Sequence, residues 1–214
     1  MMVSRVGADI FADNTIRNFQ IYGVDTTHVK KVEGMSSGVA PIFVDQHGQN
    51  SILIIKGANN ALTPAEVDAA EANIRSCGLI ILQLEIPLET VYHTIELGRR
   101  SGIPVLLNPA PATKELAIDR VCACDFFVPN ETELAILTEM PTATQEDVEH
   151  AATFLLEKGL KNVIVTLGEH NMGAVLFRHT QQPVFEHVCG HHDFGRGFLR
   201  RRHRRGERLV AHDD

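Results

Sequence analysis

The pattern of apolar and polar positions divides the chain into amphipathic stretches and short apolar runs. Apolar side chains recur at helical spacing in five segments, residues 9–21, 63–76, 88–100, 131–137 and 145–158. Short apolar runs predict strands at residues 29–32, 79–84, 105–107, 126–128, 163–166 and 174–177. Since most of these runs are continuously apolar and alternate with helices, the pattern favours a mostly parallel sheet with helices on both faces.

Two local motifs refine this picture. The runs at residues 38–44 and 51–55 are separated by a polar turn, and we expect them to form a β-hairpin. The sequence Thr63-Pro64-Ala65-Glu66 is typical of a helix start, with Thr63 as N-cap, Pro64 at the first helical position and Glu66 completing a capping box.

Composition narrows the class of protein. The 214 residues are 44% hydrophobic, enough for one large domain, and the formal net charge of −7 argues against a nucleic-acid partner. The chain contains no apolar run of the roughly 18 residues that a membrane helix needs, and its start has no signal-peptide core. The four cysteines follow no disulfide or zinc spacing, so we expect free thiols and a cytoplasmic protein without a membrane partner.

The last part of the chain has a different character. Residues 189–214 hold seven arginines and no lysine, and they lack the apolar periodicity seen upstream. We expect residues 1–188 to form a partial α/β domain and residues 189–214 to be an unfolded Arg/His-rich tail. Two alternatives remain for the tail. The first is a metal site at His187, His191 and His192, and the second is an arginine run that binds RNA or a membrane. The pattern favours both less than an ordinary solvated surface.

Polar residues that follow the predicted strands are the candidates for chemistry. In parallel sheets, ligands bind beyond the carboxyl ends of the strands. Four strands are followed there by polar or small residues: Glu85, Asn108, Asn130, and Thr166 with Gly168.

Each candidate also has a purely structural interpretation. Asn130 and Glu133 are spaced as a capping box, and the same two groups at a helix N-terminus could hold phosphate oxygens and Mg²⁺. Glu85 is either a solvated strand end or an acceptor for a sugar hydroxyl. Residues 108–112 leave a predicted strand in a rigid, extended segment, which is typical of a simple loop. A glycine-containing turn such as Thr166–Gly168 is common after strands.

Taken together and in order, six segments resemble the ribokinase family of carbohydrate kinases. They are SSGVAPIFVD, IIKGANNALTP, LILQLEIPLE, LLNPAPA, DFFVPNETE and VIVTLG, and the similarity runs from about residue 5 to residue 187. Within the family, the chain is most similar to members that phosphorylate ribose or deoxyribose. The resemblance implies a three-layer, Rossmann-like α/β sandwich with a mostly parallel sheet and a small β-lid within residues 26–56. It also implies transfer of the γ-phosphoryl group of ATP to the 5-hydroxyl of a pentose.

The resemblance assigns roles to individual residues. Glu85 would bind the sugar, Asn130 the ATP phosphates, and Glu133 would position Mg²⁺. Thr166 and Gly168 would lie along the nucleotide. ATP and Mg²⁺ are the implied cofactors, K⁺ is left open as a further ion, and lid strands that pair between subunits would make a homodimer.

The chain also departs from the family pattern. Family members carry an earlier strand with an Asn and an Asp that hold the sugar, then a G-G-K-G-A-N motif, and later a D-T-x-G-A-G-D motif whose last Asp is the general base. None of these is present in the sequence, so we expect an incomplete fold with exposed apolar sheet edges and lost or much reduced activity. The alternative is a non-catalytic fragment, or a module that dimerises through the lid.

The unusual tail has a genetic explanation, which we state as a hypothesis. If the codons of residues 192–199 are read one base later, permitted codon choices spell Thr-Thr-Ser-Ala-Gly-Asp-Ser-Phe, close to the absent motif. The tail would then be a frameshifted translation. The DNA sequence tests this, since codons for residues 195–197 that exclude Ala-Gly-Asp would refute it.

Overall fold

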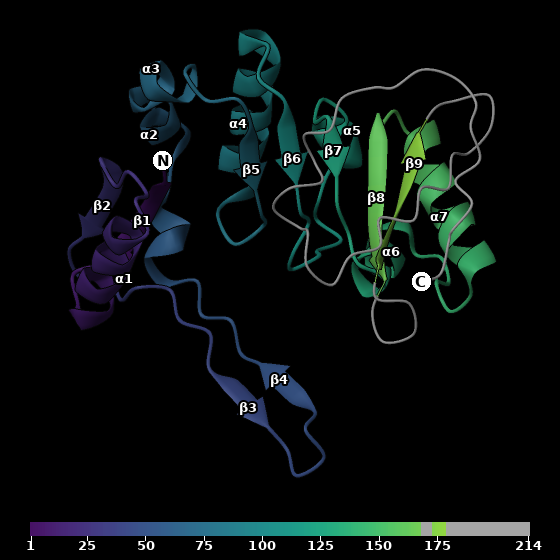
Figure 1. The fold of residues 1–214 in the computed structure, drawn as a ribbon, viewed down its shortest axis with the longest axis horizontal. Helices are drawn as coiled ribbons and strands as arrows, with labels where there is room; N and C mark the ends of the chain where they lie inside the picture. The colour runs from purple at the N-terminus through teal and green to yellow at the C-terminus, as the bar shows by residue number, and fades with distance from the viewer. Residues whose placement is uncertain (168–172, 179–214) are drawn as a thin grey trace, which may run out of the picture.

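The computed structural model describes residues 1–167 and 173–178 of the chain. Its main sheet has five strands in the order β5-β6-β7-β8-β9, of which the first four are parallel and the last is antiparallel (Figure 1). Their bounds are Ile80–Leu82 (β5), Val105–Leu107 (β6), Phe126–Phe127 (β7), Asn162–Leu167 (β8) and Gly173–Arg178 (β9). A mostly parallel sheet is therefore confirmed.

Two smaller sheets precede the main one. Strands β1 (Val3–Gly7) and β2 (His28–Val32) are parallel and joined by helix α1 (Ile10–Ile21), which makes a β-α-β unit. Strands β3 (Ile42–Val44) and β4 (Asn50–Ile52) form the expected antiparallel hairpin, which projects away from the body (Figure 1). Val39 and Ile55 continue the pairing toward its base.

The longer helices begin and end where local chemistry directs them. The carboxylate of Asp9 caps α1 by accepting the Ala12 N–H at 3.0 Å. Helix α4 (Leu88–Ser101) ends at Gly102, whose φ of 68° is left-handed. Three helices begin at capping boxes: α2 (Pro64–Ala69), α6 (Glu131–Thr138) and α7 (Gln145–Glu157).

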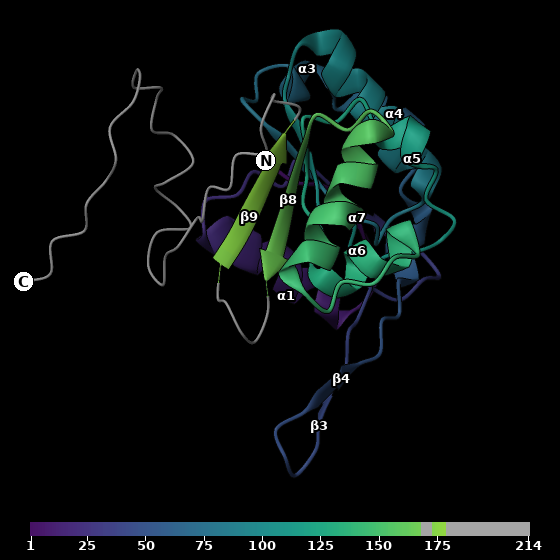
Figure 2. The ribbon, with the colours of Figure 1, turned by 90° about the vertical axis from the view of Figure 1, so that its right-hand side faces the viewer.

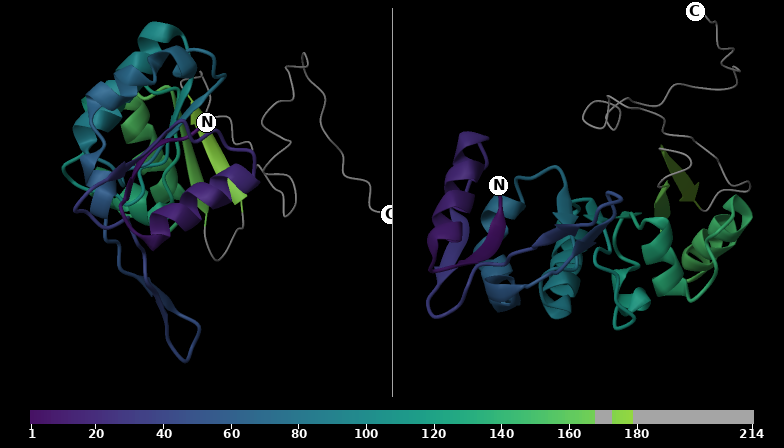
Figure 3. Two further views of the ribbon diagram at one scale, coloured as in Figure 1. Left: turned by 90° about the vertical axis from the view of Figure 1, so that its left-hand side faces the viewer. Right: turned by 90° about the horizontal axis from the view of Figure 1, so that it is seen from below.

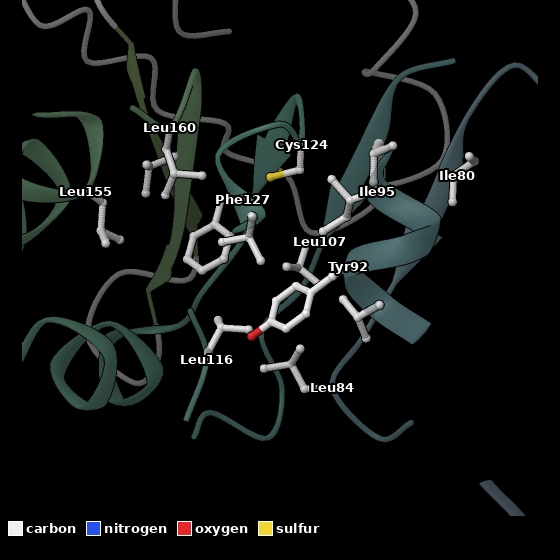
Figure 4. Packing of buried hydrophobic residues seen from close by; sticks show 14 of the residues in the cluster. Ile80, Leu84, Tyr92, Ile95, Leu107, Leu116, Cys124, Phe127, Leu155 and Leu160 are labelled. Carbon is white, nitrogen blue, oxygen red and sulfur yellow. The ribbon is translucent and has the colours of Figure 1, made fainter. Parts of the chain in front are cut away.

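The helices form layers on the two sides of the strands. Figures 2 and 3 show α4 and α7 on one side of the sheet and α1 on the other. The largest core cluster lies between the sheet and the α4–α7 layer, where Leu107 and Phe127 from the strands meet Ile95 and Leu155 from the helices (Figure 4). All four side chains are almost completely buried, so this layer anchors the strand ends that follow.

Some predicted elements differ from the structure. The helix expected over residues 63–76 is divided into α2 and α3 (Glu71–Ile74) at the fully buried Ala70, which has a φ of −97°. Strand β5 is shorter than the run at residues 79–84. The sequence pattern gave no expectation for β1, for the 3-10 helix η1 (Gly57–Ala61) or for α5 (Ile118–Val121).

The remaining sequence expectations concern the tail, membranes and thiols. The boundary at residue 188, the tail and the three histidines named above lie outside the described residues, as does Gly168. Within residues 1–167 and 173–178, no helix is both long and apolar enough to cross a bilayer. Cys77, Cys122 and Cys124 are free thiols.

Candidate functional site

The exits of the parallel strands meet at one edge of the main sheet. The Asn108 N–H, just after β6, donates to the Leu82 carbonyl at the end of β5 (2.9 Å). The Thr166 N–H donates to the Pro129 carbonyl (3.0 Å), and Asn130 forms a parallel bridge with Thr166. Three of the sequence candidates therefore lie in strand order along the carboxyl edge, as the parallel arrangement predicts.

Asn130 and Glu133 form the capping box at the start of α6. The Glu133 N–H donates to Asn130 Oδ1 (2.7 Å), and the Asn130 N–H donates to Glu133 Oε2 (2.8 Å). The structural interpretation of this pair is thus confirmed. The box uses one oxygen of each side chain, which leaves the Asn130 amide N–H groups and Glu133 Oε1 to meet a ligand. They would do so at a helix N-terminus, where the helix dipole favours anions.

Glu85 lies three residues beyond β5 and is exposed. Its neighbour Leu84 is held from two directions, because the Leu84 N–H donates to the Ala110 carbonyl (2.9 Å) and the Leu84 carbonyl accepts from Lys56 Nζ (3.2 Å). Lys56 follows the hairpin, so its ammonium group joins the base of the hairpin to the strand end that carries Glu85. Sequence reasoning missed Lys56, because only the tertiary fold brings it to β5.

The structure strengthens the case for Asn108 as a candidate site residue. Its side-chain Oδ1 is buried and accepts no hydrogen bond within the described residues. A buried polar atom without a partner is costly, and such atoms frequently face a ligand, an ion or an ordered water. The loop at residues 108–112 therefore places a buried acceptor beside the strand ends, and the residue type alone carries no signal that would have shown this burial.

The candidates are aligned but are not all in contact. Glu85 follows β5, whereas Asn130 follows β7, two strands away. At about 4.8 Å per strand the two positions are roughly 10 Å apart along the edge. That spacing suits a ligand with two ends, one held beyond β5 and the other beyond β7 and β8.

The base of the hairpin is packed against the end of β1. The buried Ser37 hydroxyl accepts from the Gly7 N–H (3.0 Å) and donates to Asp9 Oδ1 (2.7 Å), while the Ser37 N–H donates to Asp9 Oδ2 (2.7 Å). These bonds, led by the backbone bond from Ser37, lower the pKa of the Asp9 carboxyl. A Cβ on Gly7 would lie 2.3 Å from the Ser37 nitrogen, so only glycine permits this contact. The hairpin is thus fixed at its base and exposed beyond it.

The sequence matches the family model described as pfkB family carbohydrate kinase over residues 1–187. The chain belongs to the pfkB family of carbohydrate kinases. The resemblance to carbohydrate kinases inferred from the six segments is thereby confirmed, and the aligned strand exits lie within the matched region.

Curated pfkB-family relatives include two named sugar kinases. The chain is 59% identical over 169 residues to the deoxyribokinase of Salmonella typhimurium, covering 79% of this chain and 55% of that protein. It is 43% identical over 170 residues to the ribokinase of Schizosaccharomyces pombe, covering 78% of this chain and 53% of that protein. The chain therefore spans a little over half the length of these relatives.

Solved structures agree with this assignment. The ribokinase of Arabidopsis thaliana, solved in complex with ribose and ATP, superimposes with a TM-score of 0.77 at 30% sequence identity. The superposition covers 87% of this chain and 60% of that one. A ribokinase from Thermotoga maritima gives a TM-score of 0.68 at 32% identity. The ribokinase-like fold class is confirmed, and the chain represents part of it.

Proposed function

We propose that the carboxyl edge of the main sheet is the substrate edge of a pentose kinase, which binds ATP and ribose or deoxyribose. The observation that carries the proposal is the joining of Asn130 to Thr166 on adjacent strands, with Glu85 about two strands away on the same edge. The relatives support it, since they are named ribokinase and deoxyribokinase, and one solved neighbour holds ribose and ATP.

The nucleotide half of the site would lie beyond β7 and β8. The Asn130 amide and the N-terminus of α6 would donate hydrogen bonds to phosphate oxygens, while Thr166 and Gly168 would lie along the nucleotide. Glu133 and Asn108 supply oxygen atoms, the ligand type that Mg²⁺ prefers. Bound Mg²⁺ would neutralise charge on the transferring phosphoryl group. Within the described residues no three acidic, histidine or cysteine side chains gather around one point.

The sugar half would lie beyond β5. Glu85 would accept hydrogen bonds from sugar hydroxyls, with Lys56 holding the adjacent backbone in place. The hairpin would cover the sugar, fixed to the body by Ser37. Phosphoryl transfer to the 5-hydroxyl and a cytoplasmic setting complete the proposal, with K⁺ left open as a further ion. The free thiols are consistent with that setting.

The turnover of this chain is a separate question. Because the sequence contains no D-T-x-G-A-G-D motif, we propose that the chain binds its substrates and transfers phosphate very slowly, if at all. A second candidate function is a dimerisation module. It is favoured by Ile42, Phe43 and Val44 of β3, whose side chains are 61%, 61% and 64% exposed.

The test separates binding from turnover. Calorimetric titration with ATP and Mg²⁺, and with ribose and deoxyribose, should give saturable binding that Glu85→Gln weakens for the sugars alone. A coupled assay for ATP-dependent phosphorylation, with Mg²⁺ and K⁺ present, should show little or no product. If the chain binds neither ATP nor a sugar, the proposal that this edge binds substrates is refuted. Turnover at ordinary kinase rates would refute the expected loss of activity.

A further inference from the structure

A cavity in the helical layer lies away from the strand ends. It has a volume of about 380 Å³ and is lined by residues of α5, α6 and α7 and of the loop before α5 (Figure 2). The lining includes the last residues of α6, whereas Asn130 caps the other end of that helix. Because the eight residues of α6 span about 12 Å, the cavity is separate from the proposed substrate edge.

The floor of the cavity is apolar and is held by the core. Ile118, Leu137 and Phe154 line it, one from each helix, and all three pack against the largest core cluster. Each of these side chains is only partly buried, so apolar surface stays open to a ligand.

Contacts between the elements hold the walls of the cavity. The Cys122 sulfur donates to the Ile118 and Lys158 carbonyls, each at 3.2 Å, which ties α5 to the end of α7. At the end of α6, Glu139 forms an ion pair with Lys114, and both residues line the cavity. The walls are therefore in place before any ligand binds.

The backbone of Glu139 is under strain. Within residues 1–167 and 173–178 it is the one residue other than glycine with a positive φ, of 56°. Glycine is the usual residue at such a helix end, because a β-carbon is disfavoured there. Strain of this kind is frequent at ligand sites, where the surrounding contacts offset it. Here the strained residue supplies the carboxylate that pairs with Lys114 on the cavity wall.

Two charged side chains of the lining have no ion-pair partner among the described residues. They are Asp119 on α5 and Lys158 at the end of α7, which are not paired with each other either. The Lys158 ammonium group lies 5.3 Å from the centre of the Phe154 ring. Unpaired charges of opposite sign thus accompany one apolar floor, and a ligand that matches them carries both charges and an apolar group.

We propose that this cavity binds a free apolar α-amino acid in its zwitterionic form. The ammonium group would donate to Asp119, the carboxylate would accept from Lys158, and the side chain would cover the apolar floor. A ligand with a single charge would leave either Asp119 or Lys158 without a partner. The proposal does not depend on the proposed kinase function.

The experiment uses the full, isotopically labelled chain and three probes that share a phenyl group. They are L-phenylalanine, phenethylamine, which lacks the carboxylate, and 3-phenylpropionate, which lacks the ammonium group. Amide chemical shifts during titration at neutral pH should change saturably around Ile118, Leu137 and Phe154. We expect L-phenylalanine to bind about fivefold more tightly than either analogue, the upper range for one exposed ion pair.

Variants of the two unpaired residues should discriminate among the probes. Asp119→Asn should weaken L-phenylalanine and phenethylamine about fivefold and leave 3-phenylpropionate unchanged, whereas Lys158→Met should weaken L-phenylalanine and 3-phenylpropionate and leave phenethylamine unchanged. Glu115→Gln and Lys30→Met are the matched controls, because they remove exposed charges that do not line the cavity. Neither control should alter the binding of any probe.

Three results would overturn the proposal. The first is equal affinity for the three probes, which would indicate simple adhesion of the phenyl group. The second is the absence of shifts around the cavity up to the solubility limit of L-phenylalanine. The third is a loss in Glu115→Gln equal to that in Asp119→Asn, which would assign the effect to net charge alone.

Discussion

Asn130 offers the sharpest separation between a structural and a functional role. It caps α6 with a hydrogen bond of 2.7 Å from the Glu133 N–H, and we propose that its amide also meets phosphate. In Asn130→Asp the cap is kept, because Asp and Asn are equally good N-caps. A negative charge now replaces the neutral amide at the phosphate position. Stability should therefore be unchanged while ATP binding is weakened.

The expected loss of affinity follows from Coulomb's law. Two unit charges about 4 Å apart repel by about 1 kcal/mol in water and by about 4 kcal/mol near a protein surface. Since about 1.4 kcal/mol corresponds to tenfold in affinity, we expect ATP to bind at least about fivefold more weakly to Asn130→Asp. Urea unfolding should give a midpoint within error of the unaltered chain, and titration calorimetry measures the affinity.

Thr144 provides the matched control. It caps α7 in the same way, accepting the Asp147 N–H at 3.1 Å, but its position is not one of the strand exits. Thr144→Ala and Asn130→Ala should each lower the free energy of unfolding by about 1 kcal/mol. Only Asn130→Ala should weaken ATP binding. Unchanged affinity in Asn130→Asp, or an equal loss in Thr144→Ala, would refute the functional role of Asn130.

Three further predictions concern the base of the hairpin and the thiols. Ser37→Ala leaves the buried Gly7 N–H without an acceptor and should lower the free energy of unfolding by about 1–3 kcal/mol in urea titrations, whereas exposed Ser36→Ala should change it by less than about 0.5 kcal/mol. Burial raises the pKa of Cys124 to about 12. Iodoacetamide at pH 8 should therefore leave Cys124 unmodified in the native chain and should alkylate half-buried Cys77. Modification of Cys124 before Cys77 would contradict the burial of Cys124. The lowered pKa of Asp9 stabilises the fold at pH values above its ordinary value of 3.8, and this contribution should disappear as the pH falls through the lowered pKa. Asp9→Asn should remove that part of the pH dependence of unfolding, and an unaltered pH profile would count against it.

Local chemistry explains which parts of the fold the sequence could predict. The capping boxes that begin α2 and α6 depend on residues within a few positions of one another, so the sequence pattern predicts them directly. The apolar runs at β6 and β8 also predicted strands, because those strands are buried and need no polar alternation.

The features that the sequence did not predict depend on distant partners. Strand β1 contains Arg5, whose presence in a partly buried strand is explained by its ion pair with Glu66 on α2. The contact between Lys56 and Leu84 joins positions 28 residues apart. The unpartnered Oδ1 of Asn108 is likewise a property of the folded environment, since the residue type does not reveal burial.

The most direct test of the substrate edge is to locate bound ATP by amide chemical-shift mapping of the isotopically labelled chain in the presence of Mg²⁺. We expect the largest shifts at Asn130, Glu133 and Thr166, with a smaller shift at Asn108. Addition of ribose or deoxyribose should then move the amides around Glu85. Shifts concentrated on the hairpin or on α1, or no shifts at saturating ATP, would contradict the assignment of this edge as the nucleotide site.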